Sequence, residues 1–408
     1  MKLLYFFALG ALKKKGESSK MKKGFFKAAA ASLMTVILAA SVAGCGGSSS
    51  KEIKIGLLNE MTGGNATIGT AAANGAKLAI KEINANGGLL GKQIKAVVAD
   101  NKSEPSESAN AMTKLLTQDK VVAVTGTFSS SNAIAAASVA EANKTPYLVA
   151  GATNPKVTVD EKTKNVKKYI YRVCFIDPFQ GTVAANFAAK DLKVKKAAML
   201  VDNSSDYSKG LAEFFEAAFT KEGGTIVANE AYLQKDTDFK ATLTKIKSKD
   251  MDILYVPGYY EEVGKIVKQA REMGITVPIV GADGWDSPKL GEIASASALN
   301  NTYFTNHYSV EDTSPKAKAF VEAYPKPSGQ KLEALAVLGY DAVYVLADAI
   351  KRANSTDAAK IIEALATTKE FPAISGVTTI NKTHDADKNA VVIEMKDGKQ
   401  VFKTSIKP

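Results

Sequence analysis

The chain has 408 residues, of which 46% are hydrophobic and 23% are charged, a composition typical of folded globular proteins and not of disordered ones. Two cysteines exclude a disulfide-based scaffold, and two histidines exclude a histidine-rich metal site. The formal net charge of +11 suggests a nucleic-acid or membrane-surface partner, so the position of the charges matters. No apolar run reaches the ~18–20 residues of a membrane-spanning helix.

The positive charge is concentrated at the N-terminus. Residues 1–44 contain eight lysines and a single acid, Glu17, so the rest of the chain has an excess of only four positive charges and requires no nucleic-acid partner. Lysines precede a short apolar stretch, Ala28–Ala40, which small residues follow. This order is typical of a secretory signal peptide. An uncleaved signal anchor is the alternative, but the apolar stretch is short for one.

Cys45 directly follows the small residues Ala43 and Gly44. This arrangement resembles the lipobox of bacterial lipoproteins, although Val42 stands where leucine is most common. The resemblance implies cleavage before Cys45 and lipid attachment to its thiol and new amino group. Residues 45–50 then form a lipidated, flexible tether. Because Met21 begins a complete signal by itself, residues 1–20 are interpreted as an upstream mis-start.

Predicted strands and helices alternate along the rest of the chain. Short apolar runs predict strands, and apolar residues at helical spacing predict helices between them. The predicted strands are Ile53–Leu58, Ile94–Ala99, Val121–Val124, Pro146–Val149, Ala197–Val201, Ile226–Ala231, Ile253–Val256 and Pro278–Val280. Near the end of the chain, Val391–Glu394 and Gln400–Thr404 flank Asp397-Gly398, which predicts a β-hairpin.

This alternation implies βαβ units and parallel sheets that are buried on both faces. A single sheet of so many strands would be unusually wide. We therefore predict an α/β protein built from two Rossmann-like, doubly wound lobes.

Signatures of enzymes are mostly absent. No G-x-S-x-G elbow occurs, and the glycine spacing of Gly87–Lys92 does not match a phosphate-binding loop. His307 and His384 have no cysteine or carboxylate at metal-ligand spacing, so both are interpreted as solvated or structural. Cys174 lies in a strand-like segment, where a buried apolar role is expected. We predict no catalytic residue, metal or cofactor.

Polar clusters follow two predicted strands of the first half, at the strand ends where open α/β sheets bind their ligands. Gly126–Ser131 includes Ser129 and Ser130, and it lies directly before a predicted helix. Gly151–Pro155 includes Ala152 and Thr153. Free backbone amides at a helix start, with hydroxyls beside them, suit a small anion such as a carboxylate. Alternatively, these hydroxyls only cap helices.

Two strand ends of the second half carry aromatic and acidic residues. Ile253–Val256 is followed by Tyr259 and Tyr260, and Pro278–Val280 is followed by Asp283 and Trp285. An acid beside aromatic rings can hold an ammonium group by charge and cation–π attraction. A turn aspartate before glycine is the alternative.

From Lys51 to its end, the chain resembles the branched-chain amino-acid (Leu/Ile/Val) binding proteins of bacterial ABC importers. The matching stretches are Ile53–Gly56, Gly75-Ala76, Ile83–Gly88, Gly126–Ser131, Gly151–Pro155, Asp206-Tyr207 with Gly210, Thr237–Phe239 and Gly258–Tyr260. The resemblance implies a type I periplasmic-binding-protein fold whose two lobes close on the ligand.

The resemblance also implies where the chain crosses between the lobes. Three crossovers are expected, near Arg172–Asp177, Thr305–Tyr308 and Thr383–Ala390. Lobe 1 would contain residues 51–172 and 307–383, and lobe 2 would contain residues 173–306 and 384–408.

Site residues follow from the resemblance one at a time. Ser129 and Thr153 match positions that bind the ligand carboxylate through hydroxyl and amide, and Gly151 matches a carbonyl that accepts from the ligand ammonium. Asp283 matches a carboxylate, commonly glutamate, that pairs with this ammonium from lobe 2. The full expected set is Ser129, Ser130, Gly151, Ala152, Thr153, Tyr207, Tyr259, Asp283 and Trp285. Ile68 stands where an aromatic residue often covers the ligand side chain, and the disulfide of the family's first lobe is missing because Ser103 and Phe128 occupy its positions.

The expected function is therefore that of an exported, lipid-anchored receptor, a monomer that binds an aliphatic amino acid and delivers it to a membrane permease and its ATPase. The alternatives are a receptor for an amide, urea or aromatic acid, and a sensory module that reports its ligand to a membrane kinase or receptor.

Overall fold

The computed structural model describes residues 52–325 and 333–408. The predicted signal peptide, Cys45 and the predicted tether lie outside these residues. None of the described helices combines the length and the apolar character needed to cross a membrane.

The first sheet is parallel and has the strand order β2-β1-β3-β4-β5. Its elements are β1 (Glu52–Asn59), α2 (Ala66–Ala85), β2 (Gln93–Asp100), α3 (Pro105–Thr117), β3 (Ala123–Gly126), α4 (Ser130–Ala142), β4 (Tyr147–Val149), the 3₁₀ turn η1 (Pro155–Val157) and β5 (Ile170–Arg172). Leu57 and Leu58 on β1, which lies between β2 and β3, pack into hydrophobic clusters on opposite faces of the sheet. Burial on both faces explains why residues 55–58 of this strand include no polar side chain.

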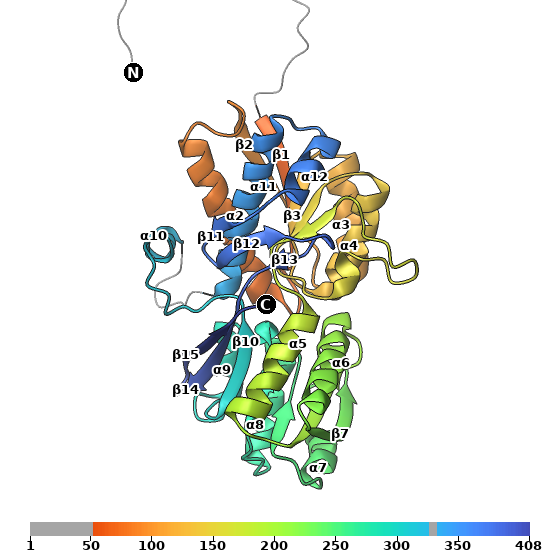
Figure 1. Ribbon diagram of the computed structural model, residues 1–408, viewed down its shortest axis with the longest axis vertical. Coiled ribbons are helices and arrows are strands. Elements are labelled where there is room, and N and C mark those ends of the chain that lie inside the picture. Colours follow the sequence, from red (N-terminus) through yellow and green to blue (C-terminus); the bar gives the residue numbers. More distant parts are fainter. Residues whose placement is uncertain (1–51, 326–332) are drawn as a thin grey trace, which may run out of the picture. The chain divides into compact units, whose positions relative to one another are not determined.

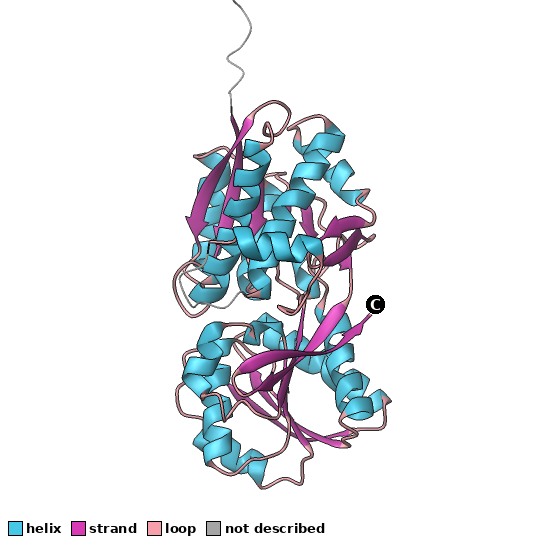
Figure 2. Ribbon diagram, turned by 90° about the vertical axis from the view of Figure 1, so that its left-hand side faces the viewer, coloured by secondary structure: helices cyan, strands magenta, loops and turns pink. Residues whose placement is uncertain are grey.

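The second sheet has the order β15-β14-β10-β9-β8-β6-β7; its strands are parallel except for β14, which runs antiparallel to both of its neighbours, β10 and β15. Its elements are α5 (Asp177–Asn186), the π-helical η2 (Phe187–Asp191), β6 (Lys196–Asp202), α6 (Asp206–Lys221), β7 (Thr225–Tyr232), α7 (Lys240–Lys247), β8 (Ile253–Tyr255), α8 (Tyr260–Glu272), β9 (Ile279–Gly281), η3 (Asp283–Trp285), α9 (Pro288–Ala294), β10 (Thr302–Asn306), β14 (Ala390–Lys396) and β15 (Lys399–Ile406). Helices enclose the strands of each sheet (Figures 1 and 2).

Between β10 and β14 the chain returns to the first sheet. This segment comprises α10 (Pro315–Ala323), α11 (Ala334–Ala353), α12 (Ala358–Ala366) and a small antiparallel sheet of β11 (Phe371–Ala373), β12 (Gly376–Ile380) and β13 (Ala386–Asp387). Helix α11 packs against α2. The chain therefore passes between the sheets three times, after β5, after β10 and after β13.

Most predicted elements coincide with observed ones. The hairpin turn Asp397-Gly398 is confirmed, and both residues have the positive φ that a type I′ turn requires. The third predicted strand was placed too early, because the observed strand begins at Ala123. The backbone N–H of Val121 instead donates to Leu115 O at the end of α3, which keeps Val121 out of the strand.

Candidate functional site between the two sheets

The carboxyl ends of the two sheets approach each other, and direct hydrogen bonds join them. Asp206 N donates to Ser131 Oγ over 3.1 Å, and Asn154 Nδ2 donates to Asp206 O over 2.8 Å. The Tyr259 hydroxyl, after β8, lies beside Ser129, after β3. The strand-end clusters predicted from the two halves of the sequence are therefore brought together.

Asp283 is a buried acid at this junction, and both of its carboxylate oxygens have partners. It begins the 3₁₀ turn η3 after β9 and is only 4% exposed. Its Oδ1 accepts hydrogen bonds from Gln180 Nε2 and from the Tyr207 hydroxyl, each over 2.7 Å, and its Oδ2 lies 3.1 Å from His307 Nε2. No lysine or arginine pairs with Asp283 within residues 52–325 and 333–408.

The partners of Asp283 are neutral. Burial lowers the pKa of His307, although the adjacent Asp283 opposes this shift, so the imidazole is uncharged at neutral pH. We assign its proton to Nε2, because the facing atom is a carboxylate oxygen. Burial also raises the pKa of Tyr207 well above its ordinary value. Neutral donors thus orient Asp283 without supplying a counter-charge.

The sequence analysis did not identify Gln180 and His307 as residues of the site. His307 was interpreted as solvated or structural, and its carboxylate partner lies 24 residues away in the chain. It directly follows Asn306, the last residue of β10, so the strand-end rule could have selected it. Gln180 lies on α5 and also donates to Thr305 Oγ1 over 2.9 Å; no pattern in its surrounding sequence marks it.

The start of α4 corrects one expectation. The amides of Phe128 and Ser129 were expected to be free, but both donate to the fully buried carboxylate of Glu60, over 3.1 and 3.2 Å. Asn101 Nδ2 adds a third bond over 3.1 Å. Burial raises the pKa of Glu60 against the opposing effect of these bonds. A protein carboxylate therefore already occupies the helix start predicted to bind an anion.

The loop after β4, residues 151–153, is partly bonded within the protein. Ala152 O accepts from Arg172 Nη1 over 2.8 Å and from Cys174 Sγ over 3.4 Å. Thr153 is fully buried; its hydroxyl lies beside the Asp177 carboxyl but makes no well-aligned hydrogen bond among the described residues. Ser130 Oγ accepts from the amide of Asn154, over 3.2 Å. Thr153 thus presents a hydroxyl that a ligand can use.

The two predicted tyrosines stack on each other beside Asp283. The ring centroids of Tyr207 and Tyr259 are 4.9 Å apart, at an interplanar angle of 23°. The Tyr207 hydroxyl also accepts from Gly284 N over 2.9 Å. The pair forms an aromatic wall next to the acid.

Trp285 belongs to the expected ligand-binding set, and its side chain packs among apolar residues. It is fully buried in the hydrophobic core, and its indole N–H donates to Val256 O over 3.0 Å. A Cβ added at Gly281 would lie 2.0 Å from the indole ring, so the glycine permits this packing. Trp285 supports the strand ends from the core side.

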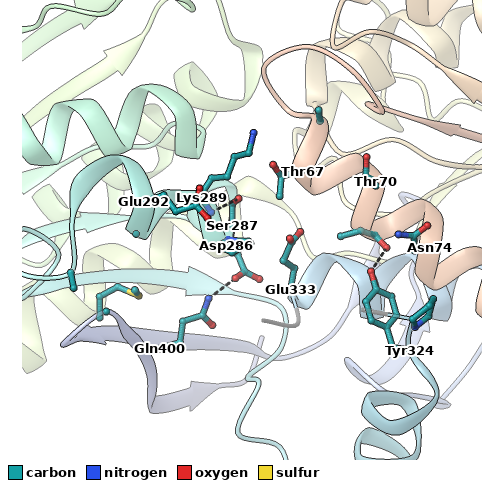
Figure 3. A pocket seen from close by; sticks show the side chains of 18 residues that line it. Thr67, Thr70, Asn74, Asp286, Ser287, Lys289, Glu292, Tyr324, Glu333 and Gln400 are labelled. Carbon is teal, nitrogen blue, oxygen red and sulfur yellow. Dashed lines mark hydrogen bonds between the residues drawn. The ribbon is translucent and has the colours of Figure 1, made fainter. Parts of the chain in front are cut away.

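A separate cavity of about 640 Å³ is lined by α2, α9 and the hairpin β14–β15 (Figure 3). Glu333 points into it, and burial together with nearby Asp286 raises the pKa of Glu333 to about 9. Neither the cluster around Asp283 nor the loop 151–153 lines this cavity. The cavity and the acid and hydroxyl groups suited to a ligand therefore lie in different places. We favour the strand ends as the ligand site, because these groups lie there.

Comparison with known proteins agrees with this architecture. The profile of the family described as periplasmic binding protein matches residues 52–400. The Leu/Ile/Val-binding protein BraC3 of Rhizobium johnstonii is 34% identical over 335 residues, which cover 82% of this chain and 89% of BraC3.

Two solved structures are similar in fold. One is the branched-chain amino acid transporter substrate-binding protein LivJ of Streptococcus pneumoniae in complex with isoleucine, with 41% identity, a TM-score of 0.81 and coverage of 88% of this chain and 100% of that one. The other is a solute-binding protein of an ABC transporter from Rhodopseudomonas palustris in complex with 3,4-dihydroxybenzoic acid, with 27% identity, a TM-score of 0.76 and coverage of 88% and 98%. The chain belongs to the periplasmic binding protein family.

Proposed function

We propose that this protein is the extracytoplasmic receptor of an ABC importer and that it binds an aliphatic, branched-chain amino acid between its lobes. Lobe 1 would comprise residues 51–172 and 307–383, and lobe 2 would comprise residues 173–306 and 384–408. The receptor would deliver its ligand to the permease and ATPase as a monomer anchored by lipid on Cys45. It catalyses no reaction in this proposal.

The observation that carries this proposal is the environment of Asp283. A buried carboxylate without a counter-charge is costly, and the groups bonded to Asp283 are neutral donors. The ammonium of an amino acid would supply the charge, with the rings of Tyr207 and Tyr259 beside it.

The ligand carboxylate would lie against lobe 1. We propose that the Thr153 and Ser129 hydroxyls bind it, with Ser130 supporting the loop and the Gly151 carbonyl accepting from the ammonium. Because Glu60 holds the amides of Phe128 and Ser129, hydroxyl groups carry more of this contact than the sequence suggested. With each lobe contributing part of the site, ligand binding would stabilise the closed arrangement.

An aromatic acid is the weaker candidate. Such a ligand brings a carboxylate and no ammonium, whereas this junction already contains the buried acids Glu60 and Asp283. Placing another anion there would add repulsion without satisfying Asp283.

Isothermal titration calorimetry tests the proposal. We expect L-leucine, L-isoleucine or L-valine to bind, whereas 4-methylpentanoate, which lacks the ammonium of leucine, and benzoate should not. Asp283→Asn should weaken amino-acid binding by about 30-fold or more, as expected when one partner of a buried charge pair is removed.

Asp202→Asn is the matched control. Asp202 is also a buried acid at a strand end of the second sheet, but it accepts from Ser204 and not from the cluster around Asp283. Unchanged affinity in Asp283→Asn, or equal binding of 4-methylpentanoate, would contradict the proposed site.

A further inference from the structure

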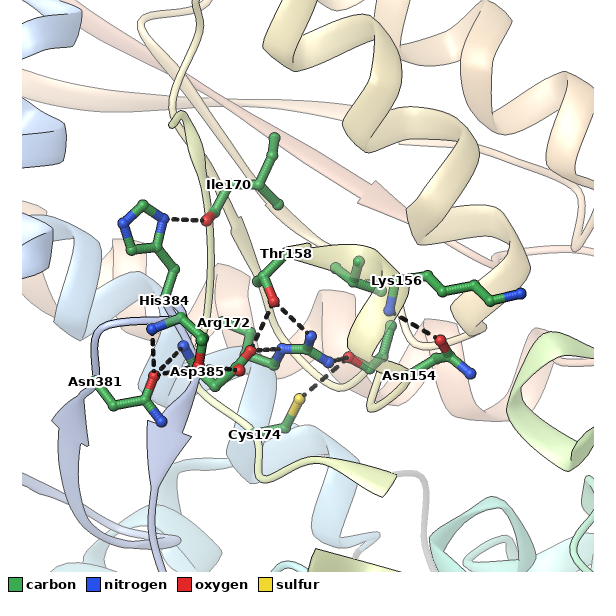
Figure 4. Close-up of polar contacts among 12 residues, drawn as sticks. Asn154, Lys156, Thr158, Ile170, Arg172, Cys174, Asn381, His384 and Asp385 are labelled. Carbon is green, nitrogen blue, oxygen red and sulfur yellow. Dashed lines mark hydrogen bonds and ion pairs between the residues drawn. The ribbon is translucent and has the colours of Figure 1, made fainter. Parts of the chain in front are cut away.

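Arg172 lies at the last position of β5, where the chain leaves the first sheet, and it is fully buried. Its guanidinium makes three contacts at once (Figure 4). Nε lies 2.6 Å from Asp385 Oδ1, Nη1 donates to Ala152 O over 2.8 Å, and Nη2 donates to Thr158 Oγ1 over 2.9 Å.

Asp385 lies in the turn between β12 and β13, just before the third passage between the sheets. Its Oδ1 also accepts from Thr158 Oγ1 over 2.8 Å, and its Oδ2 accepts from Thr383 Oγ1 over 2.7 Å. The backbone N–H of Arg172 donates to His384 O over 3.0 Å. Side chain and backbone of Arg172 thus both bind the turn between β12 and β13, while Nη1 binds the loop 151–153.

The choice of arginine is informative in this chain. Lysine supplies nearly all of its basic side chains, and arginine occurs only at Arg172, Arg271 and Arg352. A guanidinium presents several N–H donors in a rigid plane, whereas a lysine ammonium is a single point at the end of a flexible stem. Three acceptors on different segments, one of them a carboxylate, require the planar group.

We infer that Arg172 is a positioning residue for ligand binding, which fixes the loop 151–153 to the end of β5 and to the turn between β12 and β13, the segments next to the first and third passages between the sheets. This inference rests on the proposed function, because Gly151 and Thr153 on that loop are proposed to contact the ligand. Arg172 orients the Ala152 carbonyl between them, and so sets the direction of the neighbouring carbonyl and hydroxyl. Asp385 neutralises the guanidinium, which would otherwise be a buried unpaired charge.

Arg172→Lys is the primary test, because it keeps the charge but cannot reach all three acceptors. We measure its Kd for L-leucine, L-isoleucine or L-valine, whichever binds the wild type best. We expect this Kd to rise by about 10- to 100-fold, the range seen at metal sites when a residue that positions a ligating side chain is replaced. Thermal unfolding in the absence of ligand is measured in parallel, so that loss of stability and loss of affinity are separated.

Arg352→Lys is the matched control, because Arg352 has the same set of partners elsewhere. Its Nε lies 2.7 Å from Asp348 Oδ2, Nη1 donates to Ala364 O over 2.7 Å, and Nη2 donates to Thr368 Oγ1 over 2.8 Å. None of these partners belongs to the proposed ligand-binding set. Arg352→Lys should lower the Tm and leave the Kd unchanged.

Asp385→Asn provides a second, milder variant, should Arg172→Lys fail to fold. It keeps the size of the side chain and one oxygen acceptor, and we expect it to weaken binding as well. In the double variant the loss should be smaller than the product of the two single losses, because both changes break one network.

The outcomes distinguish the two proposals. If the wild type binds an amino acid and folded Arg172→Lys and Asp385→Asn bind it equally well, Arg172 is only a structural residue and the inference fails. If the wild type binds no amino acid, the proposed function fails instead.

Discussion

Asp177 and Asp283 are both buried acids at the junction of the two sheets, but their surroundings differ. Asp283 is bonded to three side chains. Neither carboxyl oxygen of Asp177 has a well-aligned hydrogen bond among the described residues. Burial, with Asp283 nearby, raises the pKa of Asp177 to about 8. Asp177 is therefore protonated near neutral pH, and Asp283 is the acid better placed to attract an ammonium.

The raised pKa of Asp177 predicts a dependence of stability on pH. In the unfolded chain this group ionises near its ordinary pKa of 3.8, and in the folded protein only near 8. At low pH Asp177 therefore contributes to the stability of the native state. This contribution to the free energy of unfolding is lost as the pH rises from about 4 to about 8. Asp177→Asn should remove the loss, raising the Tm of the ligand-free protein by a few degrees at about pH 8.5 and little at about pH 4.5.

The exposed Asp191 on η2 serves as the control for this measurement. Asp191→Asn should leave the difference in Tm between the two pH values as it is in the wild type. A Tm of Asp177→Asn that follows the wild type at both pH values would show that Asp177 ionises normally in the folded protein.

The sequence predicted some residues of the site and not others, and the reason is physical. Asp283 and Thr153 were predicted because each follows a recognisable strand. Glu60 also follows a strand directly, but its role depends on the amides of Phe128 and Ser129 from another strand end. Such bonds between distant segments leave no spacing pattern in the chain.

Among the elements, α11 shows how packing overrides local preference. Gly339 in the middle of this helix disfavours helix formation. A Cβ at Gly339 would lie 2.2 Å from Ala72 O on α2, so the glycine allows the two helices to pack closely. The sequence analysis predicted no element between Val280 and Val391. The less buried face of α11 is narrow and begins with Tyr340 and Tyr344, so few strongly polar residues mark it in the sequence.

Gly339→Ala should therefore destabilise the protein, in spite of alanine's higher helix propensity. We expect a loss of about 1–3 kcal/mol, the usual cost of overpacking a core, measured by chemical denaturation. Gly291 in α9 has no atom within 4 Å of an added Cβ. Gly291→Ala should accordingly gain about 0.5–1 kcal/mol from helix propensity. If Gly339→Ala and Gly291→Ala changed the free energy of unfolding with the same sign and size, the α2–α11 contact would not be tight.

For the whole molecule, the two-lobe architecture was predictable because parallel strands buried on both faces give short, continuous apolar runs. The division into two large sheets followed from counting these runs, and the type I periplasmic-binding-protein fold followed from the family resemblance. The small sheet of β11, β12 and β13 was not predictable, because its strands are two to five residues long and depend on pairing with one another.

The proposed anchoring also concerns the whole molecule. In cells that express the full chain, we expect a clickable fatty-acid analogue to label the wild type, and the labelled protein to sediment with membranes. Cys45→Ala should lose the label, because the thiol that would accept the lipid is removed. Cys174→Ala is the control, since Cys174 is the other cysteine of the chain and is fully buried. Labelling retained in Cys45→Ala would contradict lipidation at this residue.

The bonds around Asp283 have a consequence for changing what the receptor recognises. Gln180 lies just after the first passage between the sheets, and His307 directly follows β10 at the second. If Asp283 were replaced by an apolar residue to suit a ligand without an ammonium, the N–H groups of both would be left buried without an acceptor, at a cost of about 1–3 kcal/mol each. A new specificity would therefore require positions 180, 283 and 307 to be changed together, although positions 180 and 307 lie next to the passages between the sheets.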